Sequence, residues 1–246
     1  MISARLVAAA AILAGLLTPA LPVHATRHVN RCPATTREPA FYAPGHGRTV
    51  ALTFDDGPGP STKRILGILA SHHVPATFFN IGDQIADRRA EVRAEVNQGE
   101  AVGNHTWDHH KLSSMTESAQ AREIDREAAA QETATGLPPC IFRPPYGAYD
   151  KATLRLAASR HQAVWLWSVD PQDWKANGSA SIAWIRRIIS GAEAGGSQRH
   201  PVVLLHNTAG GNPATVAALP AIIHFYRSHG YRFVQLFDPK LEAITG

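Results

Sequence analysis

The sequence lacks the motifs and charge runs that link proteins to nucleotides or nucleic acids. It contains neither a GxGxxG pattern nor a P-loop, so no motif supports nucleotide binding. Lysine and arginine form no cluster, and the net charge is only +4 over 246 residues. This weak, dispersed charge argues against a nucleic-acid partner. Internal repeats are also missing, so we expect one domain with a tail.

Cysteine is scarce as well, with Cys32 and Cys140 the only two in the chain. Neither has a second cysteine or histidine at zinc-finger spacing, which argues against a cysteine-ligated metal. In an exported protein an even pair indicates one disulfide, here between the N-terminal segment and the domain. Two buried free thiols are the alternative.

Long apolar runs are missing outside the first 25 residues. Arg5, an apolar stretch at 6–17 and the small-residue site Val23-His24-Ala25 together indicate a secretory signal peptide. The stretch is short for a membrane span, and an uncleaved anchor helix is the alternative. We expect a mature protein that is secreted or associated with the cell wall and does not contact a membrane.

Residues 26–47 are rich in turn-forming residues and predict an extended lead-in, followed by one domain at 48–246. In that domain strand and helix patterns alternate. The predicted strands lie at 50–55, 76–80, 101–103, 141–142, 163–167, 201–205 and 233–236. The predicted helices lie at 61–72, 83–99, 114–136 (opened by a capping box at Ser114 and Glu117), 150–160, 179–193 and 212–230.

This alternation, with continuous apolar strands, predicts an α/β fold with a parallel sheet covered by helices. The polar candidates all follow the carboxyl ends of predicted strands: Asp55, Asp56, His105, Arg143, Asp173 and His206. A (β/α) barrel brings such positions together at one face. An open doubly wound sheet is the alternative.

The stretch Thr53–Pro58 places two adjacent carboxylates, Asp55 and Asp56, where a buried strand ends in a Gly-Pro turn. Two carboxylates at such a position are costly unless a cation accompanies them. Fifty residues later, His105 and His109 follow another strand with i, i+4 spacing. One aspartate and two histidines make a plausible metal site with open positions for water.

Five ordered stretches carry a resemblance to a known family. They are Thr53–Pro58, His105–His109, Arg143–Gly147, Asp173-Trp174 and Leu204-x-His206. Together they resemble the motifs of the polysaccharide deacetylases, the NodB-homology enzymes of carbohydrate esterase family 4. The resemblance covers about residues 48–237, and no motif position departs from the family pattern. It implies a distorted (β/α)7 barrel, in agreement with the alternation of strands and helices.

The resemblance implies that Asp56, His105 and His109 bind a divalent metal, most often Zn²⁺, with Co²⁺ or another divalent ion as alternatives. Carboxylate and imidazole ligands suit zinc. In this family the metal polarises an acetamide carbonyl and lowers the pKa of water.

The resemblance also implies acid–base roles for four side chains. Asp55 would be the general base, oriented by the planar fork of Arg143. His206 would be the general acid that protonates the departing amine. Asp173 would orient His206 and keep it protonated.

Three further residues would contact the substrate if the resemblance holds. The backbone N–H of Tyr146 would stabilise the oxyanion. Trp174 and Leu204 would form the wall of the pocket that accepts the acetyl methyl group. Without the resemblance, Trp174 and Leu204 would be interpreted as core residues.

The function that we expect is secreted, metal-dependent removal of N-acetyl groups from N-acetylglucosamine polymers, either peptidoglycan or chitin-type. An acetylxylan esterase with the same machinery is one alternative, and a non-catalytic wall-binding module is another. Adjacent Asp55 and Asp56 argue against glycoside hydrolysis, which separates its carboxyl groups by about 5–9 Å. A monomer is expected.

Overall fold

The structure is a computed structural model that describes residues 27–29, 32–239 and 242–244. The signal peptide predicted at 1–25 lies outside these residues. Within them, none of the helices has the length and apolar character needed to cross a bilayer.

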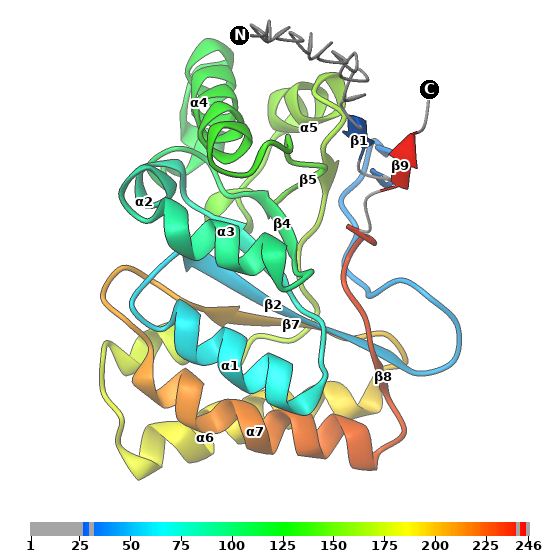
Figure 1. The fold of residues 1–246 in the computed structure, drawn as a ribbon, viewed down its shortest axis with the longest axis vertical. Coiled ribbons are helices and arrows are strands. Elements are labelled where there is room, and N and C mark those ends of the chain that lie inside the picture. Colours follow the sequence, from blue (N-terminus) through cyan, green and yellow to red (C-terminus); the bar gives the residue numbers. More distant parts are fainter. Residues whose placement is uncertain (1–26, 30–31, 240–241, 245–246) are drawn as a thin grey trace, which may run out of the picture.

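A seven-stranded parallel sheet forms the centre of the molecule (Figure 1). Its order is β6-β5-β4-β3-β2-β7, and β8 pairs with the start of β2. The strands are β2 (Thr49–Gly57), β3 (Thr77–Asn80), β4 (Ala101–Asn104), β5 (Ile141–Phe142), β6 (Ala163–Val164), β7 (Val202–His206) and β8 (Arg232–Phe233). A separate antiparallel pair joins β1 (Arg27–Val29) to β9 (Glu242–Ile244).

Among the described residues, seven α-helices and four 3-10 helices connect or cover the strands. The α-helices are α1 (Thr62–His72), α2 (Gly82–Asp87), α3 (Arg89–Asn97), α4 (Glu117–Thr135), α5 (Lys151–Ser159), α6 (Ile182–Glu193) and α7 (Pro213–Ser228). The 3-10 helices are η1 (Leu112–Ser114), η2 (Pro145–Gly147), η3 (Asp173–Ala176) and η4 (Ala194–Ser197). Helices α1, α6 and α7 pack together beside β2 and β7 (Figure 1).

Alternate residues of the strands face two different cores, as the two-residue period of a strand requires. On the outer face, Leu52 and Phe54 pack with apolar residues of α1 and α7. On the inner face, Ala51 and Phe79 belong to a cluster that contains no helical residue. A doubly wound sheet would have helices on both faces. The structure therefore confirms the predicted α/β class and agrees with the distorted barrel.

The barrel is not closed by direct pairing of β6 with β7; the segment 40–43 lies between them. Ala40 donates its N–H to Val164 and accepts a hydrogen bond from Leu166. Farther along the segment, Tyr42 bridges to Pro201.

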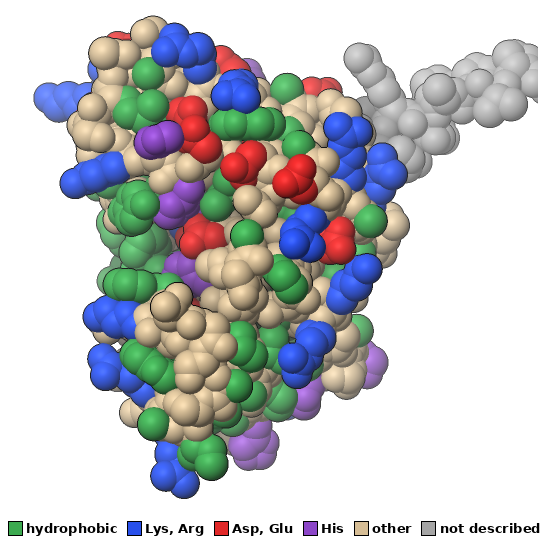
Figure 2. All heavy atoms as spheres, turned by 90° about the vertical axis from the view of Figure 1, so that its left-hand side faces the viewer, with side chains coloured by type: hydrophobic (Ala, Val, Ile, Leu, Met, Phe, Trp, Pro, Cys, Tyr) green, Lys and Arg blue, Asp and Glu red, His purple; other side chains and the backbone are tan. Residues whose placement is uncertain are grey.

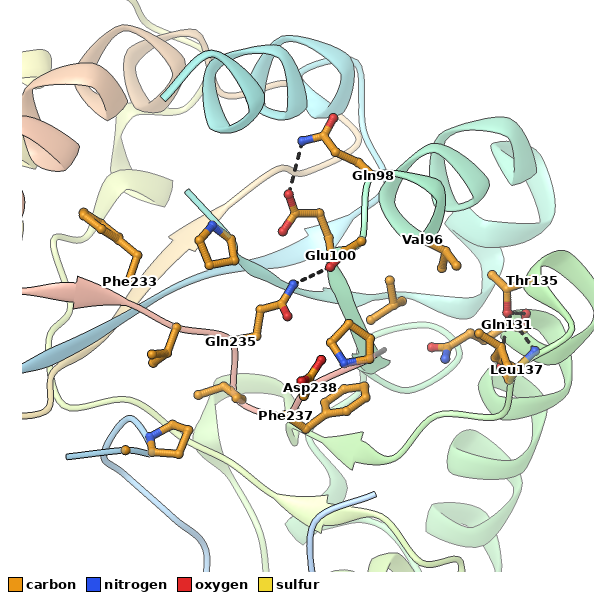
Figure 3. Close-up of a pocket in the computed structure, with 18 of the residues that line it drawn as sticks. Val96, Gln98, Glu100, Gln131, Thr135, Leu137, Phe233, Gln235, Phe237 and Asp238 are labelled. Carbon is orange, nitrogen blue, oxygen red and sulfur yellow. Dashed lines mark hydrogen bonds between the residues drawn. The ribbon is translucent and has the colours of Figure 1, made fainter. Parts of the chain in front are cut away.

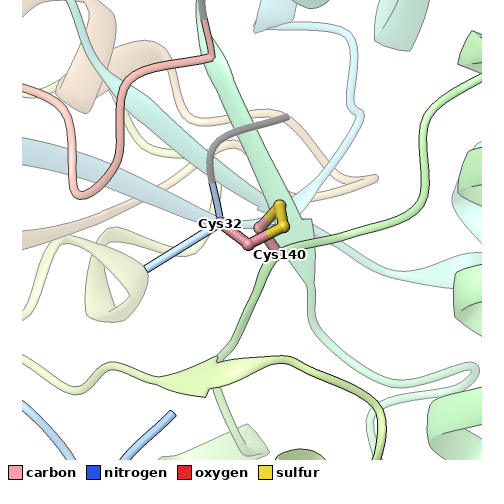
Figure 4. Close-up of a disulfide and its surroundings, with 2 residues drawn as sticks. All are labelled: Cys32 and Cys140. Atoms are coloured by element: carbon pink, nitrogen blue, oxygen red, sulfur yellow. A yellow bond between two sulfur atoms is a disulfide. The ribbon is translucent and has the colours of Figure 1, made fainter. Parts of the chain in front are cut away.

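A disulfide joins the lead-in to the amino end of β5. It links Cys32 to Cys140 across 108 residues of sequence (Figure 4). Because Cys140 is fully buried, this bond anchors the segment that precedes residues 40–43.

Several predicted elements have different bounds from those expected; the last strand, expected at 233–236, is β8 at Arg232–Phe233. The helix expected at 83–99 is broken at Arg88, whose φ of −130° is not helical. Gly82, at the start of α2, packs so closely on Trp107 that a Cβ would lie 2.6 Å from the ring; α2 packs along α4, and α3 packs on both α4 and β4. The strand expected at 163–167 ends at Val164, because Trp165 pairs with the lead-in.

The expected capping box at Ser114 was wrong. Thr116 caps α4, accepting a hydrogen bond from the Ala119 N–H at 3.3 Å. Ser114 belongs instead to η1, which is anchored by the buried Leu112.

Candidate active site

The polar candidates meet at the carboxyl ends of the strands. Figure 2 views the molecule from the side toward which β2 points in Figure 1, and histidine and acidic side chains gather near the middle of that face. Neighbouring strands supply them in register, since Asp55 of β2 lies opposite His206 of β7. Convergence at this edge follows from the parallel sheet.

Asp56, His105 and His109 form a compact group of potential metal ligands. Asp56 Oδ1 lies 3.3 Å from His105 Nε2 and 3.0 Å from His109 Nε2. One ligand atom from each residue lies within 4.8 Å of the others. Burial alone would raise the pKa of Asp56, but the two imidazoles outweigh it and hold this pKa well below its ordinary range.

The hydrogen bonds around this group fit a divalent cation. His105 Nδ1 lies 2.7 Å from the Arg143 carbonyl, which can only accept, so Nδ1 carries the proton and Nε2 presents a lone pair. Asp56 Oδ1 is buried and has no hydrogen-bond partner among the described residues. An orphaned carboxylate oxygen beside imidazole nitrogens is the donor set that zinc prefers.

Backbone geometry at the site is unusual and is held in place by local hydrogen bonds. Four site residues have positive φ values near +65°: Asp56, Thr106, His109 and Tyr146. Such left-handed conformations persist in non-glycine residues only where the surroundings enforce them. Asn104 accepts from the Thr106 N–H at 2.8 Å, and Thr106 accepts from the His109 N–H at 3.2 Å. These contacts shape the loop that carries both histidines.

Gly57 allows the chain to turn directly after the two carboxylates. A Cβ at this position would lie 2.4 Å from Asn207 Nδ2, so only glycine fits. The bond from Gly57 to Pro58 is cis. The turn lets Asp55 and Asp56 face one site although they are adjacent on a strand.

Asp55 is held by a fully buried arginine. Arg143 Nη1 lies 2.7 Å from Asp55 Oδ1 and also donates to Thr53 Oγ1 at 2.8 Å. The other donors of Arg143 bond to the carbonyls of Trp165 and Leu166. Since every arm of the guanidinium is fixed, the Asp55 carboxylate is fixed too.

The second carboxylate oxygen of Asp55, Oδ2, lies 3.8 Å from His105 Nε2. That distance exceeds the one from His105 to Asp56. Asp55 thus lies beside the candidate metal group without belonging to it.

His206 and Asp173 form a buried pair across from the metal group. The ring nitrogen Nδ1 of His206 lies 2.6 Å from Asp173 Oδ1, and the backbone N–H of His206 donates to Asp173 Oδ2 at 2.9 Å. Burial would lower the pKa of His206, but the charge and hydrogen bond of Asp173, with Asp56 and Asp55 nearby, raise it to about 9. His206 is therefore protonated at neutral pH.

The three residues predicted to contact the substrate, Tyr146, Trp174 and Leu204, differ in exposure and in whether they line a cavity. Tyr146 is 66% exposed and its ring lies edge-on to His109, with 4.7 Å between ring centroids. A cavity of about 680 Å³ opens there, lined by His109, His110, Lys111, Tyr146, Gly147 and Ala148. Trp174 is also exposed, whereas Leu204 is buried, and neither lines this cavity.

A larger cavity, about 820 Å³, lies at the opposite end of the strands (Figure 3). Glu100, Gln98 and Gln235 contribute amide and carboxyl groups, which bond largely to one another and to the backbone. It contains none of the motif residues.

Two hydroxyl side chains complete the site: Thr53, the first residue of the Thr53–Pro58 motif, and Thr215, which lies outside the motifs. Thr53 accepts from Arg143, and Thr215 donates to Asp173. Sequence reasoning missed Thr215, which lies in the first turn of α7 and gives no local signal of its contact with Asp173. Asp170, three residues before Asp173, caps a turn by accepting a hydrogen bond from the Gln172 N–H at 2.8 Å.

Comparison with known proteins decides the family. The sequence profile described as polysaccharide deacetylase matches residues 43–164. A peptidoglycan-N-acetylglucosamine deacetylase of Bacillus cereus is 36% identical over 199 residues, which are 80% of this chain and 70% of that protein. The chain belongs to the polysaccharide deacetylase family. The resemblance carried by the five motifs is thereby confirmed.

Other polysaccharide deacetylases extend the comparison. The peptidoglycan-N-acetylglucosamine deacetylase PgdA of Listeria monocytogenes is 32% identical over 214 residues, 85% of this chain. Those residues are 43% of PgdA, so the chain spans less than half of that relative. The crystal structure of the Bc1960 peptidoglycan N-acetylglucosamine deacetylase, at 35% identity, superposes with a TM-score of 0.74 over 80% of this chain and 90% of that one. This likeness confirms the fold expected for the family.

Proposed function

We propose that this protein is a secreted, metal-dependent deacetylase that hydrolyses N-acetyl groups of N-acetylglucosamine polymers, with peptidoglycan as the first candidate. One observation carries the proposal: a three-ligand metal group, an arginine-held aspartate and a histidine paired with a buried aspartate meet at one face. The names of the Bacillus and Listeria relatives support peptidoglycan. The signal-like residues 1–25 support secretion.

Asp56, His105 and His109 would hold the divalent ion. When bound, the ion supplies Lewis-acid polarisation of the acetamide carbonyl and acidifies water. Asp55 removes the proton from the attacking water, and its position follows from the hydrogen bond to Arg143. The water oxygen forms a bond to the acetyl carbon, and the carbonyl oxygen takes the negative charge. The Tyr146 N–H is proposed to donate to that oxygen.

Collapse of this state breaks the carbon–nitrogen bond and releases acetate. An amine leaves poorly unless it is protonated, and His206 is placed to donate its proton from Nε2, since Nδ1 is bonded to Asp173. Asp173 keeps the charged imidazole stable in a buried setting. The cavity beside His109 and Tyr146 opens to solvent, which suits a sugar chain that approaches from the side.

The test is acetate release from N-acetylglucosamine oligomers, peptidoglycan fragments and acetylated xylan, each with chelator and then with zinc restored. We expect chelator-sensitive, zinc-rescued release from at least one amide substrate. Release from xylan alone would make the protein an esterase. No release with zinc bound would favour a wall-binding module.

A variant separates amide from ester chemistry. An alcohol leaves with less help from an acid than an amine does, so His206→Ala should impair amide turnover far more than ester turnover. Equal loss on both substrates would contradict the general-acid role.

A further inference from the structure

Thr215 is the buried hydroxyl group that contacts the Asp173–His206 pair from outside the motifs. It is the third residue of α7 and has no exposed surface. Its Oγ1 donates to Asp173 Oδ2 at 2.7 Å. The strand that carries His206 and the helix that carries Thr215 are joined by a short loop, so both reach Asp173 from the same stretch of chain.

The hydrogen bonds fix both oxygens of the Asp173 carboxylate. Oδ1 faces the ring nitrogen Nδ1 of His206 at 2.6 Å. Oδ2 accepts one hydrogen bond from the backbone N–H of His206 at 2.9 Å and another from the Thr215 hydroxyl. Asp173 is 1% exposed, so water cannot readily take the place of a lost hydrogen-bond donor, and losing one costs free energy. Without the hydroxyl, Oδ2 keeps one donor and the carboxylate can rotate away from Nδ1.

We propose that Thr215 is a positioning residue that holds Asp173 in line with His206 and so keeps His206 in its proton-donating form. This inference rests on the proposed function. The charged groups that face His206 are Asp173 from η3 together with Asp55 and Asp56 from β2. A change at Thr215 leaves all three in place and alters only how Asp173 is held.

Two variants of similar size distinguish the hydroxyl from the packing. Thr215→Val keeps the branched shape and removes the donor, whereas Thr215→Ser keeps the donor and removes a methyl group. We expect Thr215→Val to lower kcat about tenfold with little change in KM, because a hydrogen bond to a charged group is lost. Thr215→Ser should retain most of kcat. Val216→Ala, which removes buried volume from the same helix, should lower Tm without changing the pH profile.

A second readout does not depend on activity. The pKa of His206 can be followed by NMR in the metal-free protein, with its signal among the 13 histidines identified by its loss in His206→Ala. Thr215→Val should lower this pKa by about one unit, and Thr215→Ser should restore it. If Thr215→Val does not fold, Thr215→Ala compared with Thr215→Ser makes the same distinction.

The outcomes separate the two proposals. An unchanged kcat and His206 titration in Thr215→Val, or equal defects in the valine and serine variants, would overturn the positioning role while the proposed function stood. Full amide turnover by His206→Ala would overturn the general-acid assignment, although the NMR titration would still report whether Thr215 controls the pair.

Discussion

Buried carboxyl groups occur in two regions of this molecule, and the two regions treat them differently. At the strand ends, Asp55 contacts Arg143 and Asp173 contacts the protonated His206. In the layer of α3 and α4, Glu95 and Glu127 are fully buried, and no cation contacts either one among the described residues. Both regions are dry, but only the first supplies compensating positive charge.

The difference decides which groups carry charge at neutral pH. Burial raises the pKa of Glu95 to about 8 and that of Glu127 well above its ordinary value. Both are therefore neutral acids inside the helical layer, whereas the imidazoles of His105 and His109 hold the pKa of Asp56 well below its ordinary range and keep it ionised. A buried carboxyl group alone does not mark chemistry; a buried carboxylate with a fixed cation does.

The largest expected effect comes from separating the two aspartates of β2. Asp55→Asn should keep the metal and lower kcat about a thousandfold, because the general base is lost. Asp56→Ala should lose metal and activity together. Metal content by atomic spectroscopy beside acetate release checks both, and full turnover by Asp55→Asn would remove the base assignment.

Removing a buried cation tests the first region directly. Arg143→Met leaves Asp55 buried without its partner and should lower the free energy of unfolding by about 3–5 kcal/mol. The control is Arg160→Met, which breaks the more exposed pair with Asp125 and should cost about 1 kcal/mol or less. Urea unfolding measures both. If both variants lowered the free energy of unfolding by about 1 kcal/mol or less, the buried Asp55 would not need the charge of Arg143.

Glu95 tests the second region. Its folded pKa of about 8 exceeds the ordinary 4.5, so its contribution to stability is complete below pH 4.5 and is lost as pH rises toward 8. The Asn80 side-chain amide donates to Glu95 Oε2 at 2.6 Å, whereas Asn80 Oδ1 is buried and accepts no hydrogen bond among the described residues. A protonated Glu95, or a glutamine at this position, could donate to that oxygen.

Glu95→Gln should therefore be more stable than wild type by roughly 4 kcal/mol at pH 8 and by less than about 1 kcal/mol at pH 5. Urea unfolding at the two pH values, with wild type and variant side by side, isolates this group from all others. A constant difference across that range would mean that Glu95 is not neutral in the folded protein.

The smallest effect concerns pH and activity. Because the pKa of His206 is raised to about 9, its proton is present below that pH and is lost above it. Amide turnover should fall about tenfold per pH unit above 9. Asp173→Asn should move this decline to lower pH, and an unmoved decline would show that another group causes it.

The motifs allowed most of the site to be located from sequence, because each lies at the end of an apolar strand. Asp55, Asp56, His105 and His206 needed only the rule that parallel strands end at one edge. Thr215 could not be found this way, since a threonine in the first turn of a helix has an ordinary local role and its contact with Asp173 exists only in three dimensions.

The layer formed by α2, α3 and α4 was harder to predict from the sequence. The break at Arg88 carries no glycine or proline, so no local signal in the sequence marks it. Glu95 and Glu127 lie on amphipathic helices, where sequence pattern assigns glutamate to solvent. Their burial depends on how α3 and α4 meet, which no local pattern specifies.

The segment at 40–43 has a consequence for how the chain is assembled in time. It is synthesised early, yet its partners come late: the bond from Trp165 Nε1 to the Tyr42 carbonyl spans 123 residues. The seam between β6 and β7 therefore cannot form until nearly the whole domain exists. In a truncated chain that stops before β7, the edge of β2 that β7 would cover stays unpaired and is presented to neighbouring chains.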